Sequence, residues 1–243
     1  MATTKVFSEL YEEKYDIEVS DEITVKLVRC LASDDYVVQA AQVSAKGENN
    51  PETVSERLIN SLMAHRHGSP FEHNSFTFFV EAPVFVIREW QRHRMSSFNE
   101  MSGRYTKMKP KFYIPQDSRP AKNQGTSMVP FMVEHPELYM HNLNLTQDAM
   151  ESWDTYQMAL DNGIANEVAR IGLPLNLYTQ MYWTVNARSL MNFLSLRIES
   201  VYSQVMSHPQ LEIQMAAEQV EDIFREHMPL TYDAFVNKGR IAP

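Results

Sequence analysis

Three observations together predict a single globular domain of the α+β class for this chain of 243 residues. Its composition, 44% hydrophobic and 22% charged, is typical of a globular protein that buries roughly 70% of its unfolded surface. Segments with strand and helix patterns alternate without the regular spacing of βαβ units. The one linker-like stretch, 117–130, separates neither repeats nor blocks of different composition, so we expect a single domain, 1–243.

Periodicity predicts the first elements of the chain. Residues 22–31 alternate and are rich in valine, which predicts a strand, and a helix capped by Ser33 or Asp34 should follow to residue 43. Asn50-Pro51 is typical of a helix start, and this helix should end near residue 67. Its apolar residues recur every fourth position and predict one buried face, formed by Val54, Leu58 and Leu62.

The middle of the chain predicts strands joined through a helix and a loop. Residues 75–82 are aromatic and β-branched, which predicts a strand, and Pro83 can then begin a helix that runs to about residue 94. Residues 96–104 are polar and without period, which predicts a loop. A short strand is expected at 111–114.

The second half of the chain is mainly helical in pattern. Residues 137–162 predict a long helix ended by Gly163, and a short helix at 164–171 should precede Pro174. The remaining patterns predict a strand at 176–185 and helices at 186–207 and 209–227.

Charge indicates the kind of ligand. The net charge of −9 argues against general nucleic-acid binding, which requires cations to neutralise phosphates. Yet residues 88–111 carry seven cations against two anions, a local net charge of +5 that suits a small anionic ligand, although a solvated basic loop would look alike. None of the seven glycines lies within two positions of another, which excludes glycine-rich phosphate loops. Side chains must therefore hold any phosphate.

Several classes of protein are disfavoured. The single cysteine, Cys30, excludes an internal disulfide and a CxxC metal knuckle. No stretch approaches the ~18 apolar residues that a membrane span needs, and the first residues lack an apolar leader, so we expect a cytoplasmic protein without a membrane partner. Glycine and proline interrupt His65, His67 and His73, and we expect no metal site.

The densest polar chemistry lies in residues 92–105, RHRMSSFNEMSGRY. Arginine binds phosphate oxygens bidentately, while glutamate, asparagine and serine supply the donors and acceptors that a base or sugar needs. The segment therefore indicates a nucleotide site. A charged helix end followed by a loop is the alternative interpretation.

This segment matches the pattern RHRxxSxNExSxRY and resembles the flavin-dependent thymidylate synthases. The similarity includes HGSPFEH at 67–73 and the run 167–197, and it covers about residues 23–235. It implies a mixed sheet flanked by helices, in a homotetramer whose sites are shared between subunits. It further implies that FAD, reduced by NADPH, and 5,10-methylenetetrahydrofolate convert dUMP to dTMP. A flavin- or nucleotide-binding protein without synthase activity is the alternative.

The resemblance also implies the site residues. Arg197 is the candidate catalytic residue, because a fixed guanidinium would favour ionisation at uracil N3. The candidate dUMP residues are Glu89, Arg92, Glu100, Met101, Ser102, Gly103, Arg104, Arg170 and Arg197. The candidate FAD residues are Ser69, Arg92, His93, Arg94, Glu100, Asn186, Arg188 and Asn192. Glu89 departs from the family pattern, in which glutamine is more frequent at this position.

The predicted helix 186–207 raises two further expectations. Arg188 and Arg197 are nine residues apart, about 180° around a helix, so we expect two sites or a helix placed between subunits. About seven residues after Arg197 are additional to the family pattern. Because seven residues are close to two helical turns, a continuous helix would keep its phase across them.

Overall fold

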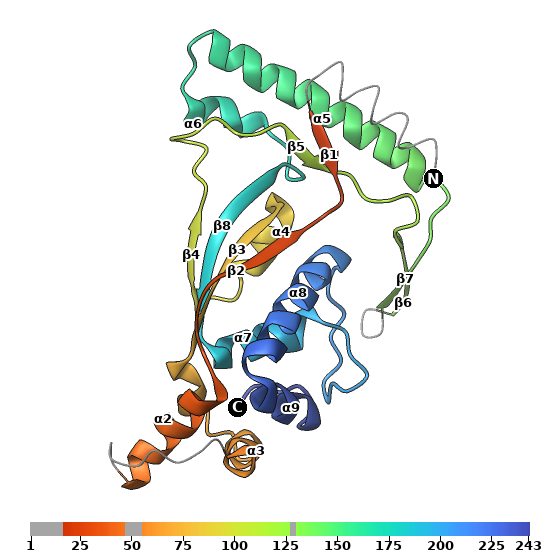
Figure 1. Ribbon diagram of the computed structural model, residues 1–243. Helices are drawn as coiled ribbons and strands as arrows, with labels where there is room; N and C mark the ends of the chain where they lie inside the picture. Colours follow the sequence, from red (N-terminus) through yellow and green to blue (C-terminus); the bar gives the residue numbers. More distant parts are fainter. Residues whose placement is uncertain (1–16, 47–54, 127–129) are drawn as a thin grey trace. The chain divides into compact units, whose positions relative to one another are not determined.

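The computed structural model describes residues 17–46, 55–126 and 130–243 (Figure 1). The chain divides into two compact units, each assembled from separate segments. Unit 1 comprises the described residues up to Ile23 together with Glu81–Arg88 and Glu100–Gln180. Unit 2 comprises Thr24–Val80, Glu89–Asn99 and Met181–Pro243. Both contain helices and strands, which confirms the predicted α+β class, while the single-domain assignment stays a prediction.

Unit 1 is built around the long helix α5 (Leu138–Asp161) and a parallel pair of strands, β1 (Glu18–Ser20) and β5 (Lys111–Tyr113). Buried residues of α5 recur at helical spacing and pack with Phe112 of β5, forming a core of Ile17, Phe112, Ala149, Met150, Trp153, Tyr156, Ala169 and Leu177. Gly163 follows α5 at φ +77, as the predicted helix end requires.

The rest of unit 1 refines two predictions. α6 (Asn166–Ala169) and the 3-10 turn η2 (Arg170–Gly172) take the place of the single short helix predicted at 164–171. An antiparallel hairpin begins within the linker-like stretch and extends past it, with β6 (Lys122–Gly125) paired with β7 (Pro130–Val133). Glycine and proline, which gave this stretch its linker-like composition, are equally frequent where hairpins turn.

The largest sheet has the strand order β2-β3-β8-β4, and most of its residues belong to unit 2. Its strands are β2 (Thr24–Leu31), β3 (Ser75–Pro83), β8 (Tyr178–Val185) and β4 (Ser97–Glu100). In unit 2, Trp90 stacks on Phe193 at a centroid distance of 4.9 Å, and Trp183 lies 5.0 Å from the same ring. These aromatic rings form the centre of the unit's core.

The helices of unit 2 include α2 (Asp34–Lys46), α3 (Glu56–Ala64), α7 (Ala187–Arg197), α8 (Leu211–His227) and α9 (Pro229–Asn237). α8 lies against both α7 and α9 (Figure 1). α3 begins behind an N-cap at Ser55 and buries Ile59 and Met63, one position later than the predicted face. The predicted start at Asn50-Pro51, and Val54, lie outside the described residues.

Three boundaries near the candidate site residues differ from prediction. α4 (Val84–Trp90) ends four residues early, and β4 occupies part of the predicted loop. β4 escaped detection because three of its four residues are exposed, so no alternation marks it. α7 ends at Arg197, where Ile198 is extended, and residues 198–210 are not helical.

Local side-chain bonds explain why the predicted helix 186–207 stops early. The Ser200 hydroxyl accepts from the Tyr202 N–H at 3.3 Å, and the Ser207 hydroxyl donates to the Leu196 carbonyl at 2.6 Å. Such bonds compete with helical ones. The expected preservation of phase across the additional residues is therefore wrong.

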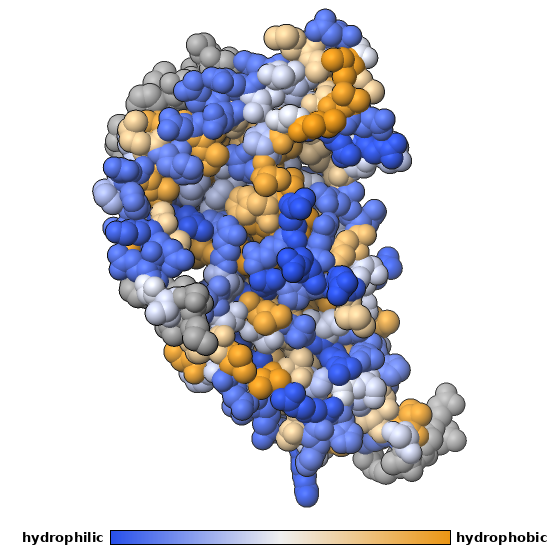
Figure 2. All heavy atoms as spheres, turned by 180° about the vertical axis from the view of Figure 1, so that it is seen from behind, coloured by the Kyte–Doolittle hydropathy of each residue, from blue (hydrophilic) through white to orange (hydrophobic). Residues whose placement is uncertain are grey.

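Exposed apolar side chains gather at the part of unit 1 that carries α6 and η2, seen at the upper right of Figure 2. They include Ile164, Val168, Ile171 and Leu175. No helix within the described residues combines the length and the apolar character that crossing a bilayer requires.

Candidate functional site

A cavity of about 740 Å³ in unit 2 gathers most of the candidate FAD residues. Its lining combines guanidiniums, amides and an imidazole with the indole of Trp183. The candidate residues that line it are Arg92, His93, Arg94, Asn186, Arg188, Asn192 and Arg197. Ser69 opens the 3-10 helix η1 (Ser69–His73) in the same unit but does not line this cavity, and Glu100 belongs to unit 1.

One face of α7 forms a wall of this cavity. Asn186 caps the helix by accepting from the Ser189 N–H at 2.8 Å. The lining residues then recur at intervals of three and four, through Ser189, Asn192 and Leu196. Arg188 and Arg197 flank this face, and their long side chains both reach the cavity. Within this unit the two arginines therefore line one cavity, which contradicts the expectation of two sites, while the placement of the helix between subunits stays a prediction.

Arg197 is held by two partners. Its Nε–H donates to Nε2 of His93 at 2.9 Å, and its Nη1–H donates to the Glu89 carboxylate. Burial, and then the charge of Arg197, lower the pKa of His93 to about 4. The imidazole is therefore neutral near pH 7 and can accept this hydrogen bond. Glu89, the departure from the family pattern, lies directly against the candidate catalytic arginine.

Arg188 is held in a comparable way. Its guanidinium donates to Glu72 at 2.5 Å and to the Pro243 carbonyl at 2.6 Å. A Cβ at Gly68 would lie only 2.5 Å from Arg188 Nε and 2.8 Å from that carbonyl, so glycine is required for this approach. Glu72 was missed as a site residue, although it lies within the HGSPFEH block.

A second cavity, of about 310 Å³, lies within unit 1. Four of the candidate dUMP residues line it: Glu100, Met101, Gly103 and Arg170. A Cβ at Gly103 would lie 2.9 Å from Met108 Sδ and 3.0 Å from Arg170 Cδ. Glycine therefore lets the chain pack closely against Arg170.

Strand β8 orients the acidic side of this cavity. The buried hydroxyl of Thr179 donates to Glu100 Oε1 at 3.0 Å, and the Met101 N–H donates to the Gln180 carbonyl at 2.8 Å. Thr179 lines the cavity and was missed by the sequence analysis. Its position in an alternating strand does not distinguish it from core residues.

Ser102 and Arg104 lie near this cavity in sequence but do not line it. Ser102 is half-buried, and its hydroxyl accepts from the Arg104 N–H at 3.3 Å. The exposed Arg104 donates from Nε to Glu167 at 2.8 Å, and Glu167 does line the cavity. In contrast, Arg92, Arg94 and Arg170 form no ion pair within the described part of the chain, and all three are exposed.

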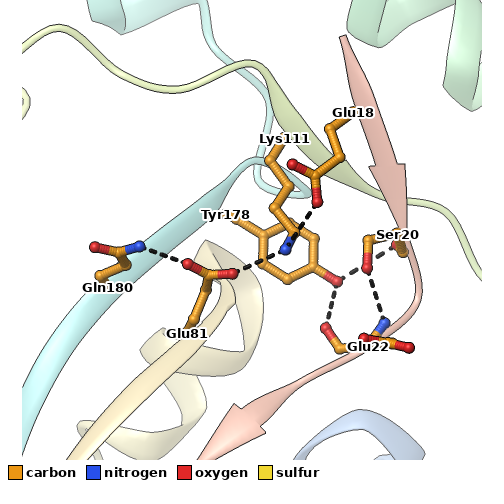
Figure 3. Close-up of polar contacts among 7 residues, drawn as sticks. All are labelled: Glu18, Ser20, Glu22, Glu81, Lys111, Tyr178 and Gln180. Atoms are coloured by element: carbon orange, nitrogen blue, oxygen red, sulfur yellow. Dashed lines mark hydrogen bonds and ion pairs between the residues drawn. The ribbon is translucent and has the colours of Figure 1, made fainter. Parts of the chain in front are cut away.

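Lys111, the last cation of the positively charged segment 88–111, contacts carboxylates of unit 1 (Figure 3). Its Nζ lies 3.0 Å from Glu18 and 2.8 Å from Glu81, above the ring of Tyr178. Burial opposes the charge of Lys111, but the bonds to both glutamates outweigh it and raise the lysine pKa. Gln180 also donates to Glu81. This cation is neutralised and is not available to a ligand.

Tyr178 completes this group, and its hydroxyl donates to the Glu22 carbonyl at 2.7 Å (Figure 3). Burial raises the pKa of Tyr178, and the nearby carboxylates act in the same direction. Elsewhere, burial raises the pKa of the half-buried thiol Cys30. Among the described residues, no three histidine, cysteine or acidic side chains gather as a metal site would require.

Comparisons with known proteins were consistent with one another. The family model described as thymidylate synthase complementing protein matches residues 26–230. A flavin-dependent thymidylate synthase of Streptomyces coelicolor is 48% identical, over 93% of this chain and 96% of the relative. One of Thermotoga neapolitana is 49% identical, over 90% of this chain and 94% of the relative.

Solved structures show the same likeness. The crystal structure of a UMP/dUMP methylase, PolB, from Streptomyces cacaoi bound with 5-Br dUMP is 43% identical, with a TM-score of 0.87. The match covers 93% of this chain and 100% of the methylase chain. The same methylase bound with 5-Br UMP superposes with a TM-score of 0.85 at 42% identity, over 93% and 99% of the two chains.

Proposed function

The chain belongs to the thymidylate synthase complementing family, the flavin-dependent thymidylate synthases, and from this premise we propose that it methylates dUMP reductively to dTMP. In this proposal FAD, reduced by NADPH, carries the hydride and 5,10-methylenetetrahydrofolate donates the carbon. The observation that carries it is the cavity in unit 2, in which Arg197 is held by two partners beside exposed guanidiniums. Both relatives named above are called flavin-dependent thymidylate synthases, and the solved neighbour is a UMP/dUMP methylase.

The cavity in unit 2 fits a flavin dinucleotide. Its volume of about 740 Å³ lies within the usual range of ligand pockets, roughly 300–1,000 Å³. Arg92 and Arg94 are exposed cations without an ion-pair partner in the described chain, and they suit the two phosphates. Asn186 and Asn192 offer amides for hydroxyl and carbonyl groups. When bound, FAD supplies hydride transfer, which the protein side chains cannot.

The remaining candidate FAD residues enter the proposal on the strength of the family pattern. Arg188, ordered by Glu72, would approach the flavin as a fixed donor, and neutral His93 would present an uncharged ring. Ser69 and Glu100 complete the proposed set.

For dUMP we assign complementary roles. On the family pattern Arg92 and Arg170, which form no ion pair among the described residues, are each assigned to phosphate, while Glu100 accepts a hydrogen bond from Thr179. Met101, Ser102, Gly103 and Arg104 would contact the sugar and base. Arg197 would stabilise the negative charge that must build in the uracil ring before C5 becomes nucleophilic. Arginine keeps its own charge throughout, so no proton from water is needed.

A cysteine nucleophile is disfavoured as the alternative route to thymidylate. The thiolate is the reactive form of cysteine, and the raised pKa of Cys30 reduces its population at neutral pH. We further propose that the protein is a cytoplasmic homotetramer whose sites are shared between subunits, and that it binds neither nucleic acid nor membranes.

The test is tritium release from C5-labelled dUMP by purified protein loaded with FAD. Release should require both methylenetetrahydrofolate and NADPH, and a parallel arm with C5-labelled UMP tests whether the ribose form is accepted. Bound flavin without tritium release would favour the alternative, a flavin-binding protein without synthase activity. Light scattering should give a mass near four times 28.2 kDa.

A further inference from the structure

We propose that Glu89 is a positioning residue that holds the Arg197 guanidinium, and that it acts on the reaction only through this arginine. The inference rests on the proposed function, in which Arg197 stabilises charge on uracil. It revises the role implied for Glu89, which was that of a direct contact with dUMP.

The geometry divides the donors of Arg197 into two sets. A guanidinium carries five N–H donors in a rigid plane. Glu89 accepts from Nη1, and His93 Nε2 accepts from Nε at 2.9 Å. No other acceptor among the described residues meets this guanidinium, so three donors, one on Nη1 and two on Nη2, remain for the cavity that Arg197 lines. Contacts at two different nitrogens of this rigid plane therefore determine which way the free donors point.

The two partners are themselves rigidly supported. Glu89 precedes Trp90, whose ring is fully buried and stacks on Phe193 at 4.9 Å. The His93 ring meets the same Phe193 ring edge to face at 4.9 Å. Both acceptors thus rest on one aromatic group of the core. Transition-state stabilisation by a fixed charge depends on support of this kind, because reorientation during the reaction costs energy.

The pair is also removed from water. Only 18% of the Arg197 side chain and 25% of the Glu89 side chain are exposed, so their attraction is screened less than that of a surface pair. A carboxylate supplies both an acceptor oxygen and a negative charge that opposes the field of the arginine. An amide would supply the oxygen alone. Positioning therefore requires the oxygen, and the charge should weaken the attraction of Arg197 for anionic ligands.

Two substitutions of Glu89 separate the acceptor oxygen from the charge. Glu89→Ala removes the acceptor, so we expect kcat for tritium release to fall roughly 30-fold while bound flavin stays unchanged. Glu89→Gln keeps an acceptor, so kcat should stay within about threefold of the unsubstituted enzyme and the Kd for dUMP should decrease. Equilibrium dialysis of dUMP with the FAD-loaded enzyme, without folate or NADPH, measures this Kd.

A matched control distinguishes positioning from general destabilisation. Glu221→Gln weakens another ion pair of unit 2, that with buried Arg240, outside the cavity-lining residues. Glu221→Gln should lower the melting temperature, and its kcat should stay within about threefold of that of the unsubstituted enzyme. Glu89→Ala with unaltered kcat, or Glu89→Gln as impaired as Glu89→Ala, would overturn the proposal.

A double-mutant cycle tests the dependence on Arg197. In an Arg197→Ala background, Glu89→Ala should change neither dUMP binding nor turnover further, because nothing remains to be positioned. The melting temperatures of the same four proteins test the contact between Glu89 and Arg197 without any measurement of activity. If the unsubstituted protein releases no tritium, the proposed function fails but this test of the contact still stands. Additive shifts in the cycle would contradict the proposed contact.

Discussion

At the scale of single residues, the arginines expected to bind ligands form two groups. Three of them face a carboxylate: Arg104 faces Glu167, Arg188 faces Glu72, and Arg197 faces Glu89. The others, Arg92, Arg94 and Arg170, form no ion pair among the described residues. A paired guanidinium is oriented but partly neutralised, whereas an unpaired one keeps its full charge for phosphate. Orientation and phosphate binding are thus divided between different arginines.

His93 makes stability depend on pH. Its pKa is about 4 in the folded protein and 6.5 when unperturbed, so above pH 6.5 both states are neutral and His93 contributes nothing. Between pH 6.5 and 4 the unfolded chain takes up a proton that the folded one does not. The free energy of unfolding should therefore decrease as the pH is lowered from 6.5 to 4, by about 3 kcal/mol at most.

Urea denaturation at pH 7, 5.5 and 4 measures this loss. Burial, and then the charge of Arg197, oppose protonation of His93, and the Arg197 Nε–H already points at His93 Nε2. His93→Asn keeps an acceptor but does not titrate, so its stability should fall less over the same range. An equal fall in both proteins would refute the assignment.

At the scale of elements, α7 shows how one helix serves both folding and ligand binding. Its N-cap, Asn186, satisfies the Ser189 N–H and also lines the cavity. Its body buries Leu190, Phe193 and Leu194 in the core, and its last residue is Arg197. The buried face and the ligand face thus lie on the same eleven helical residues, and the residue that caps them also lines the cavity.

Two substitutions of Asn186 separate these roles. Asn186→Ala removes the cap and should lower the free energy of unfolding by about 1 kcal/mol. The same substitution should reduce the amount of flavin that stays bound. Asn186→Ser restores a capping oxygen without the amide, so stability should recover while flavin retention does not. Urea midpoints and the ratio of flavin to protein absorbance provide the two readouts. Recovery of both by serine would show that the amide has no role in binding.

At the scale of the whole molecule, each unit contains a group of polar contacts, here called a tie, that joins segments far apart in the sequence. In unit 1 Lys111 and Glu81 connect β5, β1 and β3 (Figure 3). In unit 2 the buried Asp34 accepts from the N–H groups of Leu230 and Thr231 and from the Thr231 hydroxyl, at the start of α9. Asp34, considered as a cap for its own helix, instead caps a helix nearly two hundred residues away.

Loss of this tie should destabilise unit 2. Asp34→Ala leaves three donors without their acceptor, and we expect the free energy of unfolding to fall by roughly 2–3 kcal/mol. Asp35→Ala, on an exposed neighbour in the same helical turn, should change it by less than about 0.5 kcal/mol. Chemical denaturation of both variants makes the comparison, and equal effects would argue against the tie.

The sequence by itself determined most helices and strands, the segment 92–105 and the residues expected to bind ligands. It could do so because periodicity, helix ends and motif spacing are local properties, read within a few turns of chain. It missed β4, an exposed strand without alternation, and the end of α7, where serine side chains compete with helical bonds.

Only the tertiary structure decided how the arginines are used. Glu72 and Arg188 are 116 residues apart, and Glu89 and Arg197 are 108 apart. The motif itself is divided between the two units after Asn99. Which carboxylate meets which guanidinium depends on the path of the whole chain through the core, and a local pattern carries no record of that path.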